Sequence, residues 1–338
     1  MKIVVVGAGL IGHKHIELVS NAGWLRAVVD PSPHAAEVAR KYGASWFPNI
    51  DDCLQNDIPD GMVIATPNQL HVEHGLACVK AGIPILVEKP IADSSTAALK
   101  LVEAAEFANV PILVGHHRRH NPLIQAAHDE IAKGRLGDIV AVNAQFWLYK
   151  PDDYFSVDWR TRKGAGPVFI NLIHDVDLLR YLCGEVVSVQ AMESKSTRKF
   201  DVEDTAAILM RFENGALGTV TVSDTVVAPW SWELTSGENA AYPKTPMSCY
   251  KIGGTDSSLS IPDMTLWSHR SKKSWWEPID SGAISFKQDD PLTSQLHHFA
   301  RVIESGEQPI VSGREGLKTL RVIEAIKSAA VSGQTQFL

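Results

Sequence analysis

The sequence lacks the features that mark nucleic-acid-binding, membrane-spanning and zinc-binding proteins. Its formal net charge is −7, with no block of like charges beyond short pairs such as Arg118-Arg119, which argues against nucleic acid or an anionic membrane as the main partner. The four cysteines have no C-x-x-C spacing, so neither a zinc site nor a redox pair is predicted, and reduced thiols in the cytoplasm fit best. No apolar run reaches the roughly 18 residues of a membrane helix.

The chain instead has the composition of an ordinary globular protein. It contains 338 residues, of which 45% are hydrophobic and 21% charged, which is enough for two compact domains. The apolar start at residues 3–6 is too short for a signal peptide and runs directly into glycines. A small molecule is therefore the expected partner, and the scattered histidines, such as His13 and His15, predict no metal site.

The first 115 or so residues alternate short β-branched runs with segments of helical spacing. This alternation predicts an α/β fold with a doubly wound parallel sheet of the Rossmann type. The expected strands are residues 2–6, 25–29, 62–65, 84–87 and 111–114, and the expected helices are 13–22, 34–42, 69–81 and 94–108.

From about residue 138 the pattern changes to alternating apolar and polar positions, which predicts half-buried antiparallel strands. The expected strands are residues 140–148, 186–192, 205–212, 219–222, 247–252 and 274–279, and the expected helices are 170–183, 292–305 and 317–330. We therefore expect a Rossmann domain at 1–121 and, at 122–338, an α+β domain with a large open, mostly antiparallel sheet. The last helix, 317–330, could pack back on the first domain. An open sheet of this size must cover one face, and self-association is a natural way to do so, which predicts a homodimer or homotetramer.

A glycine motif, Gly7-x-Gly9-x-x-Gly12, follows the first strand and opens the first helix. In this context Gly7 permits a tight turn, Gly9 lets a pyrophosphate approach the backbone, and Gly12 allows close packing of helix and strand. Leu10 and Ile11, between the last two glycines, are predicted to contact the cofactor with them. The alternative is a glycine turn without a ligand.

Asp30 lies eighteen residues after Gly12, at the end of the second strand. A carboxylate there can accept hydrogen bonds from a ribose diol and would repel a 2′-phosphate, so NAD is preferred over NADP. The alternative is that Asp30 only forms the turn before Pro31.

The segment Val87-Glu88-Lys89-Pro90 places a charged pair and a proline at the end of a buried strand. In open α/β folds, ligands bind at this carboxyl edge of the sheet, so Lys89 is a candidate catalytic residue. Its alternative role is a salt bridge with a nearby acid. A cis bond before Pro90 would be one way to aim the lysine.

Together these residues resemble the glucose-fructose oxidoreductase and inositol dehydrogenase family (Gfo/Idh/MocA). The resemblance rests on an ordered series over nearly the whole chain: Gly7 to Gly12, Asp30, Ala65-Thr66-Pro67-Asn68 with His71, Ala81-Gly82, Val87 to Pro90, Trp159-Arg160, and His174 with Asp177. It implies a two-domain NAD(P)-dependent dehydrogenase whose second domain binds the substrate and forms the oligomer.

The resemblance also implies roles for individual residues. Lys89 and His174 would flank the reactive carbon. The implied cofactor contacts are Thr66, Pro67, Asn68, His71, Glu88, Lys89, Trp159 and Arg160. Family members often carry an aspartate four residues before the histidine, where this chain has Ile170. Asn171 is the nearest polar substitute; it can bind a substrate hydroxyl but cannot take a proton. In a regular helix it would face away from His174 by one position.

Oxidation of a secondary alcohol requires a base that touches the hydroxyl. We expect His174 to be this base and Lys89 to donate to the same oxygen, which stabilises developing alkoxide charge. The alternative for His174 is a buried structural histidine. Asp177, three residues later, could orient the imidazole or cap the helix.

The substrate is expected to be a cyclic polyol, sugar or sugar derivative of the inositol class, bound by Lys89, Asn171 and His174. Arg118 and Arg119 could bind a carboxylate, which favours an alternative substrate, a dihydrodiol of an aromatic acid; they could also make interdomain or cofactor contacts. Trp230 could form a sugar platform or anchor an interface. A third possibility is a non-enzymatic sensor of NAD(H), against which the presence of both Lys89 and His174 argues.

Overall fold

The computed structural model describes residues 1–56, 58–162 and 164–338, and these form two compact units. The first unit consists of Met1–His117 and Pro291–Leu320, and the second of Arg118–Asp290 and Arg321–Leu338. The segment 291–320 therefore lies in the first unit, whereas the expected domain division placed all of residues 122–338 in the second domain. It belongs to the first unit because apolar side chains of helix α9 (Pro291–Ser305), including Phe299 and Ile303, close against Gly61, leaving no room for a side chain there.

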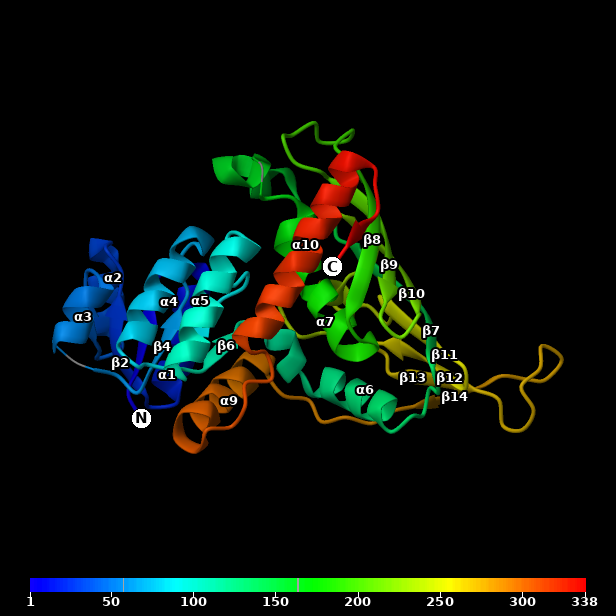
Figure 1. Cartoon of the computed structure of the whole chain (residues 1–338), viewed down its shortest axis with the longest axis horizontal. Coiled ribbons are helices and arrows are strands. Elements are labelled where there is room, and N and C mark those ends of the chain that lie inside the picture. The colour runs from blue at the N-terminus through cyan, green and yellow to red at the C-terminus, as the bar shows by residue number, and fades with distance from the viewer. Residues whose placement is uncertain (57, 163) are drawn as a thin grey trace. The chain divides into compact units, whose positions relative to one another are not determined.

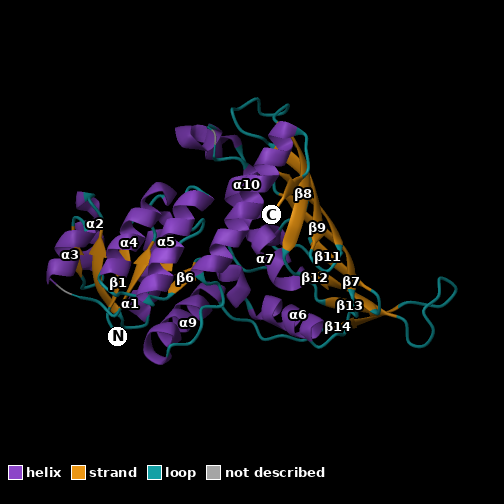
Figure 2. Ribbon diagram, viewed as in Figure 1, coloured by secondary structure: helices purple, strands orange, loops and turns teal. Residues whose placement is uncertain are grey.

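The first unit is built on a six-stranded parallel sheet in the order β3-β2-β1-β4-β5-β6 (Figures 1 and 2). This order is that of a dinucleotide-binding Rossmann fold and confirms the predicted class. Its strands are β1 (Ile3–Val6), β2 (Leu25–Val29), β3 (Ser45–Phe47), β4 (Gly61–Ile64), β5 (Ile85–Val87) and β6 (Ile112–Val114). The central strands are buried on both faces, which explains why they appear in the sequence as unbroken apolar runs.

Helices connect and cover these strands. They are α1 (Leu10–Asn21), α2 (Pro33–Lys41), α3 (Ile50–Asn56), α4 (His71–Lys80), α5 (Ser95–Ala108), α9 and the start of α10 (Gly313–Ser332). Helices α4 and α5 pack side by side, and α1 packs with α9 (Figure 1). β3 and α3 were not predicted, because β3 is short and largely exposed and α3 has only two buried residues, so neither has a clear apolar period.

The second unit contains a nine-stranded sheet, within the described residues, in the order β14-β13-β12-β11-β7-β10-β9-β8-β15. Its strands are β7 (Ile139–Trp147), β8 (Val186–Ser194), β9 (Thr205–Phe212), β10 (Leu217–Ser223), β11 (Tyr250–Gly254), β12 (Ser257–Ile261), β13 (Thr265–Ser268), β14 (Asp280–Ala283) and β15 (Gln336–Phe337). Pairing is antiparallel except between β7 and β10, which run parallel in the middle of the sheet. The expected mostly antiparallel sheet is therefore confirmed.

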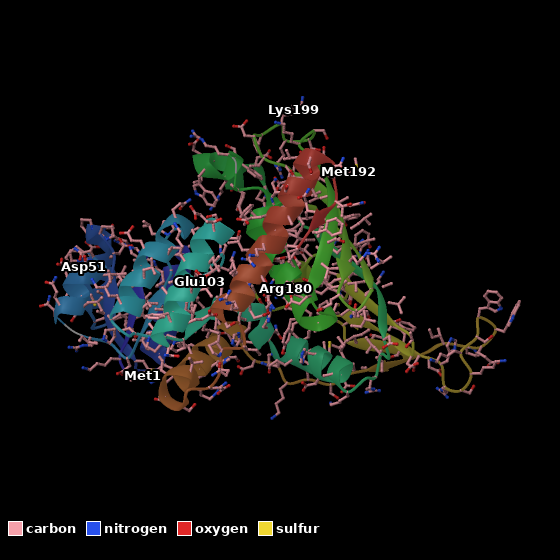
Figure 3. All side chains as sticks on the ribbon, in the orientation of Figure 1. Met1, Asp51, Glu103, Arg180, Met192 and Lys199 are labelled. Atoms are coloured by element: carbon pink, nitrogen blue, oxygen red, sulfur yellow. The ribbon has the colours of Figure 1, made fainter. Side chains whose placement is uncertain are left out.

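Helices cover one face of this sheet, and no helix of the residues that the structure describes lies over the other face (Figure 1). The covering helices are α6 (Pro122–Ala132), α7 (Ile173–Cys183) and the C-terminal part of α10. Strand β9 alternates strictly, with Ile208 and Met210 buried in the core and Leu209 54% exposed on the other face. Met192 of β8, labelled in Figure 3, is also exposed.

Residues 274–279 do not form the predicted strand. They lie in a loop between β13 and β14, where Trp275 is 90% and Trp276 85% exposed. Pro278 cannot donate a backbone hydrogen bond to a neighbouring strand, and pairing starts only at Asp280. The two tryptophans therefore do not pack on the sheet. No helix in the described part of the chain is long and apolar enough to cross a membrane.

Candidate active site

The glycine loop between β1 and α1 has the shape that a dinucleotide needs. Gly7 has a φ of +97°, and a Cβ there would lie 2.6 Å from the carbonyl oxygen of Ala65. A Cβ on Gly9 would meet nothing within 4 Å, so this side of the loop is open, whereas one on Gly12 would collide with the Gly7 carbonyl. Turn, open approach and close packing are the three separate roles expected of these glycines.

Helix α1 begins at this loop without a side-chain cap. Its N-cap residue is Gly9, so the first backbone N–H groups are available to an anion. Leu10 is 93% exposed and Ile11 37% exposed, although both are large apolar side chains. The residues present thus fit a bound pyrophosphate, with apolar surface beside it for the rest of a nucleotide.

Asp30 joins the end of β2 to the glycine loop. Its Oδ2 accepts the N–H of Ala8 at 2.8 Å, and its Oδ1 accepts the N–H of Ser32 at 2.8 Å. Two backbone donors hold the carboxylate in a defined direction, and each oxygen keeps a further lone pair for a ribose hydroxyl. Asp30 therefore does more than form the turn before Pro31, because its side chain also fixes the backbone of Ala8.

His71 connects the ends of β4 and β5. Its ring is fully buried, with Nδ1 2.8 Å from the carbonyl oxygen of Pro90 and Nε2 2.8 Å from that of Thr66. Burial lowers the pKa of His71, although both backbone contacts oppose the shift. With both nitrogens on carbonyl oxygens, His71 braces the loop that carries Thr66, Pro67 and Asn68, and its predicted cofactor contact stays a prediction.

Glu88 is also an internal residue. It is 6% exposed, and its Oε1 lies 2.8 Å from Nε2 of His15 on α1. Burial alone would raise the pKa of Glu88, but the hydrogen bond and charge of His15, together with Lys89 and His117, lower it to about 2. Glu88 therefore contacts the helix that carries the glycine loop, and its predicted contact with the cofactor stays a prediction.

Lys89 follows directly, and the Lys89-Pro90 peptide bond is cis. Lys89 is half-buried, and its backbone N–H donates to Oε2 of Glu88 at 3.2 Å. Lys89 thus lies at the carboxyl edge of the sheet, on a loop that His15 and His71 hold from two sides.

In the second unit, His174 is the second residue of α7, and a π-helical turn, η5 (Val168–Leu172), precedes it. Such turns add a residue to the helical path, so Asn171 does not have the direction that a regular helix would give it. His174 itself is 9% exposed. Asn171 is half-buried, and its Oδ1 accepts a hydrogen bond from Nζ of Lys150 at 2.8 Å.

The start of the π-helical turn is held by a buried carboxylate. Oε1 of Glu203 accepts the N–H of Val168 at 3.0 Å, and its Oε2 accepts from Nζ of Lys327 at 2.6 Å. A Cβ on Gly166 would collide with this carboxylate, so only glycine fits there. Glu203 and Lys327 therefore define where the segment with Asn171 and His174 begins.

Arg118 and Arg119 are buried and bind carboxylates of their own unit. Arg119 donates through Nε and one terminal nitrogen to both oxygens of Asp177, at 2.8 and 2.7 Å. Arg118 contacts Asp175 at 3.3 Å and Glu233 at 2.8 Å. These pairs argue against the predicted role of the two arginines in binding a substrate carboxylate. Both carboxylate oxygens of Asp177 accept hydrogen bonds from Arg119, so Asp177 holds this arginine.

Asp175, next to His174, has an unusual environment. It is 1% exposed and accepts a hydrogen bond from the hydroxyl of Tyr250. Burial raises the pKa of Asp175 to about 7, although Arg118 and Tyr250 oppose the shift.

Trp159 and Arg160 lie in the 3₁₀ turn η4 (Asp158–Thr161) of the second unit. Trp159 is 55% exposed, and the Arg160 guanidinium lies 4.1 Å from the ring centre of Tyr154 and donates to the Tyr154 carbonyl at 2.7 Å. Trp230 is half-buried and packs edge-on against Trp147 of β7. Their predicted cofactor and substrate contacts stay predictions.

Comparison with known proteins assigns the chain to a family. Residues 1–116 match the oxidoreductase family with an NAD-binding Rossmann fold, and residues 124–242 match the GFO/IDH/MocA C-terminal domain. The chain belongs to the Gfo/Idh/MocA family of NAD-binding oxidoreductases, which confirms the resemblance and the assignment as an enzyme acting on alcohol groups.

Its relatives carry several activities. The 4-carboxy-2-hydroxymuconate-6-semialdehyde dehydrogenase of Sphingobium sp. is 30% identical over 66% of this chain and 72% of its own. Inositol 2-dehydrogenase 2 of Saccharopolyspora erythraea is 31% identical over 66% of each chain. Among solved structures, the WlbA dehydrogenase from Bordetella pertussis in complex with NADH and UDP-GlcNAcA is 25% identical, with a TM-score of 0.79 over 100% of this chain and 98% of that one.

Sequence reasoning missed His15, Lys150 and Glu203. His15 is three residues after Gly12, on the face of α1 that must pack on the sheet, which is a detectable signal for a buried polar contact. Lys150 follows an alternating strand, as Lys89 follows an apolar one, so both are cations at strand ends. Glu203 has no such signal, because its partners Val168 and Lys327 are distant in the chain.

Proposed function

We propose that this protein is an NAD-dependent dehydrogenase that oxidises a secondary hydroxyl of a cyclic polyol, sugar or sugar derivative. The observation that carries the proposal is a glycine loop open at Gly9, in a chain that also presents a histidine, His174, directly after a π-helical turn. NAD, when bound, supplies the hydride acceptor.

Each residue has a separate part in this proposal. The N–H groups at the start of α1 bind the pyrophosphate, and Asp30 binds the ribose diol. His174 takes the proton of the substrate hydroxyl, which suits an imidazole near neutral pH. Lys89 donates a hydrogen bond to the same oxygen and stabilises the negative charge that develops there.

The polyol class is supported by the likeness to inositol 2-dehydrogenase 2. A second candidate, a carboxylated cyclic diol, is supported by the likeness to the Sphingobium enzyme, which by its name acts on a carboxylated compound. The ion pairs of Arg118 and Arg119 speak against these arginines as the group that would bind the carboxylate. We therefore rank the polyol first.

The test is a screen for NAD reduction at neutral to alkaline pH with myo-inositol, D-glucose, levoglucosan and a dihydrodiol of benzoate. Turnover of at least one polyol is expected, and turnover of the dihydrodiol alone would select the second candidate. Lys89→Ala and His174→Ala should each keep NADH binding and lose roughly 100-fold or more in kcat. The exposed residues Lys80 and His297 provide matched controls, as Lys80→Ala and His297→Ala. Near-wild-type kcat in either site variant would refute the mechanism.

We also propose that the protein is a cytoplasmic homodimer or homotetramer. The helix-free face of the nine-stranded sheet exposes Met192, Leu209 and Leu217, and burying such side chains between copies would remove them from water. Light scattering on the purified protein tests this assembly: a monomer at micromolar concentration would contradict it.

A further inference from the structure

Lys150 is a buried cation in the second unit, and the mechanism above does not use it. It is 6% exposed and lies three residues after the end of β7. Its backbone is fixed at both ends: its N–H donates to the carbonyl oxygen of Asp224 at 2.9 Å, and its own carbonyl accepts from Arg198 at 2.6 Å. A residue held in this way can aim its side chain in one direction.

The ammonium group is directed at Asn171. Nζ lies 2.8 Å from Oδ1 of Asn171 and 3.7 Å from Oδ2 of Asp224, and the ring centre of Tyr154 lies 4.9 Å from it. Burial lowers the pKa of Lys150, with Asp224 opposing the shift. The contact with Asn171 is therefore not a loose surface interaction; it is a hydrogen bond inside a charged cluster.

This contact determines which way the Asn171 amide points. A lysine ammonium has only donors, so the atom of Asn171 that faces it must be the oxygen. The Nδ2 group, with its two hydrogens, must then point away from Lys150, and no acceptor among the described residues takes them. Asn171 is consequently a hydrogen-bond donor to whatever lies in front of it.

We infer that Lys150 is a positioning residue, which fixes Asn171 so that its Nδ2 hydrogens bind an oxygen lone pair of the substrate. The inference rests on the proposed function. It assigns to Asn171 a role different from that of an aspartate near this position, since an amide held by its oxygen cannot accept a hydroxyl proton. The Nδ2 hydrogens would favour substrates that have an acceptor oxygen next to the reacting carbon, such as a neighbouring hydroxyl or a ring ether.

Kinetics of a double-mutant cycle test the coupling. Lys150→Met keeps most of the stem and removes the donors, Lys150→Arg restores donors, and Asn171→Ala removes the amide. With the polyol that gives the highest turnover in the screen, Lys150→Met and Asn171→Ala should each raise KM about tenfold, with kcat less affected. Adding Lys150→Met to Asn171→Ala should change KM less than twofold, and Lys150→Arg should recover part of the loss. Lys133→Met, at an exposed lysine, is the control.

A second measurement does not depend on turnover. Crystal structures of the wild type and Lys150→Met, both with NADH, should show that the Asn171 side chain turns or becomes disordered in the variant. If no polyol is turned over but Asn171 moves, the proposed function fails and the positioning role stands. If Asn171 keeps its conformation, or if the two substitutions raise KM independently, the inference is wrong.

Discussion

His15 and Glu88 form a hydrogen bond inside the first unit, with 2.8 Å between Nε2 and Oε1, although 73 residues separate them in the chain. His15 belongs to the helix that opens with the glycine loop, and Glu88 precedes Lys89. The pair therefore links the element that would bind the pyrophosphate to the loop that carries the candidate catalytic lysine. Because both side chains are buried, the link is protected from water and from salt.

The charge of Glu88 should make the protein sensitive to acid. The pKa of Glu88 is lowered to about 2 from 4.5, so its contribution to stability is fully present above about pH 4.5 and is lost as the pH falls toward 2. Glu88→Gln removes this titration and should lower the free energy of unfolding at pH 6 by about 3 kcal/mol, a difference that narrows toward pH 3. Urea unfolding of both proteins at several pH values measures this difference in the free energy of unfolding.

Glu103→Gln is the matched control for Glu88→Gln. Glu103 is an exposed glutamate on α5 of the same unit, labelled in Figure 3. Its substitution should change the free energy of unfolding by less than about 0.5 kcal/mol at either pH. Equal effects of the two substitutions, or a Glu88→Gln effect independent of pH, would show that the buried charge is not what stabilises this region.

Asp30 should decide between the two nicotinamide cofactors. In Asp30→Asn only one oxygen remains, so the N–H groups of Ala8 and Ser32 can no longer both be satisfied, and the charge that repels a 2′-phosphate is gone. The Kd for NADH, from fluorescence titration, should rise roughly tenfold, since a hydrogen bond to a charged group is worth about 1.5–3 kcal/mol. The Kd for NADPH should fall or stay constant. If the ratio of the Kd for NADH to the Kd for NADPH is the same in Asp30→Asn as in the wild type, the role of Asp30 is refuted.

The fold of the first unit could be predicted from the sequence because its signals are local. Buried parallel strands are unbroken apolar runs, and the glycine loop is a contiguous motif whose three roles the structure reproduces at Gly7, Gly9 and Gly12. The second sheet was correctly predicted to be mostly antiparallel. The parallel pairing of β7 with β10 was not predicted, because pairing between distant strands leaves no trace in the alternating pattern of either strand.

The site was harder to predict where function depends on contacts across the chain. Lys89 and His174 stand in recognisable motifs, whereas Lys150 is identified only by the 2.8 Å contact with Asn171. Arg118 and Arg119 look like anion ligands in the sequence, and only the structure shows that carboxylates of the same unit bind them. A basic residue can be recognised from sequence, but its partner cannot.

Gly166 should not tolerate a side chain. A methyl group there would meet the Glu203 carboxylate, which Lys327 and the N–H of Val168 hold in place. Gly166→Ala should lower the free energy of unfolding by about 1–3 kcal/mol, as overpacking does, and reduce kcat/KM because the π-helical turn before His174 must shift. Calorimetry and steady-state kinetics measure the two effects.

Gly282→Ala is the control for this substitution, since a Cβ on Gly282 meets nothing within 4 Å. It should leave stability and kcat/KM near the wild-type values. The double variant Gly166→Ala/Glu203→Ala should recover part of the packing loss, because the clashing carboxylate is removed. Failure of Glu203→Ala to relieve the effect of Gly166→Ala would mean that the clash is not its cause.

Asp175 should produce a pH dependence opposite in sign to that of Glu88. The pKa of Asp175 is raised from 3.8 to about 7, so the folded protein binds this proton more tightly than the unfolded chain. Its contribution to stability is therefore fully present below about pH 4 and is lost as the pH rises to about 7. Asp175→Asn cannot titrate, and its amide oxygen can still accept from Tyr250.

The free energy of unfolding of Asp175→Asn should therefore rise relative to the wild type by about 2–4 kcal/mol between about pH 4 and pH 7. Arg118 keeps Glu233 as a charged partner in this variant, so the guanidinium is not left alone. Asp129 is an exposed aspartate on α6 and provides the control. The free energy of unfolding of Asp129→Asn should change with pH in the same way as that of the wild type over this range. If the difference between Asp175→Asn and the wild type falls with rising pH, then Asp175 is ionised throughout and its pair with Arg118 outweighs its burial.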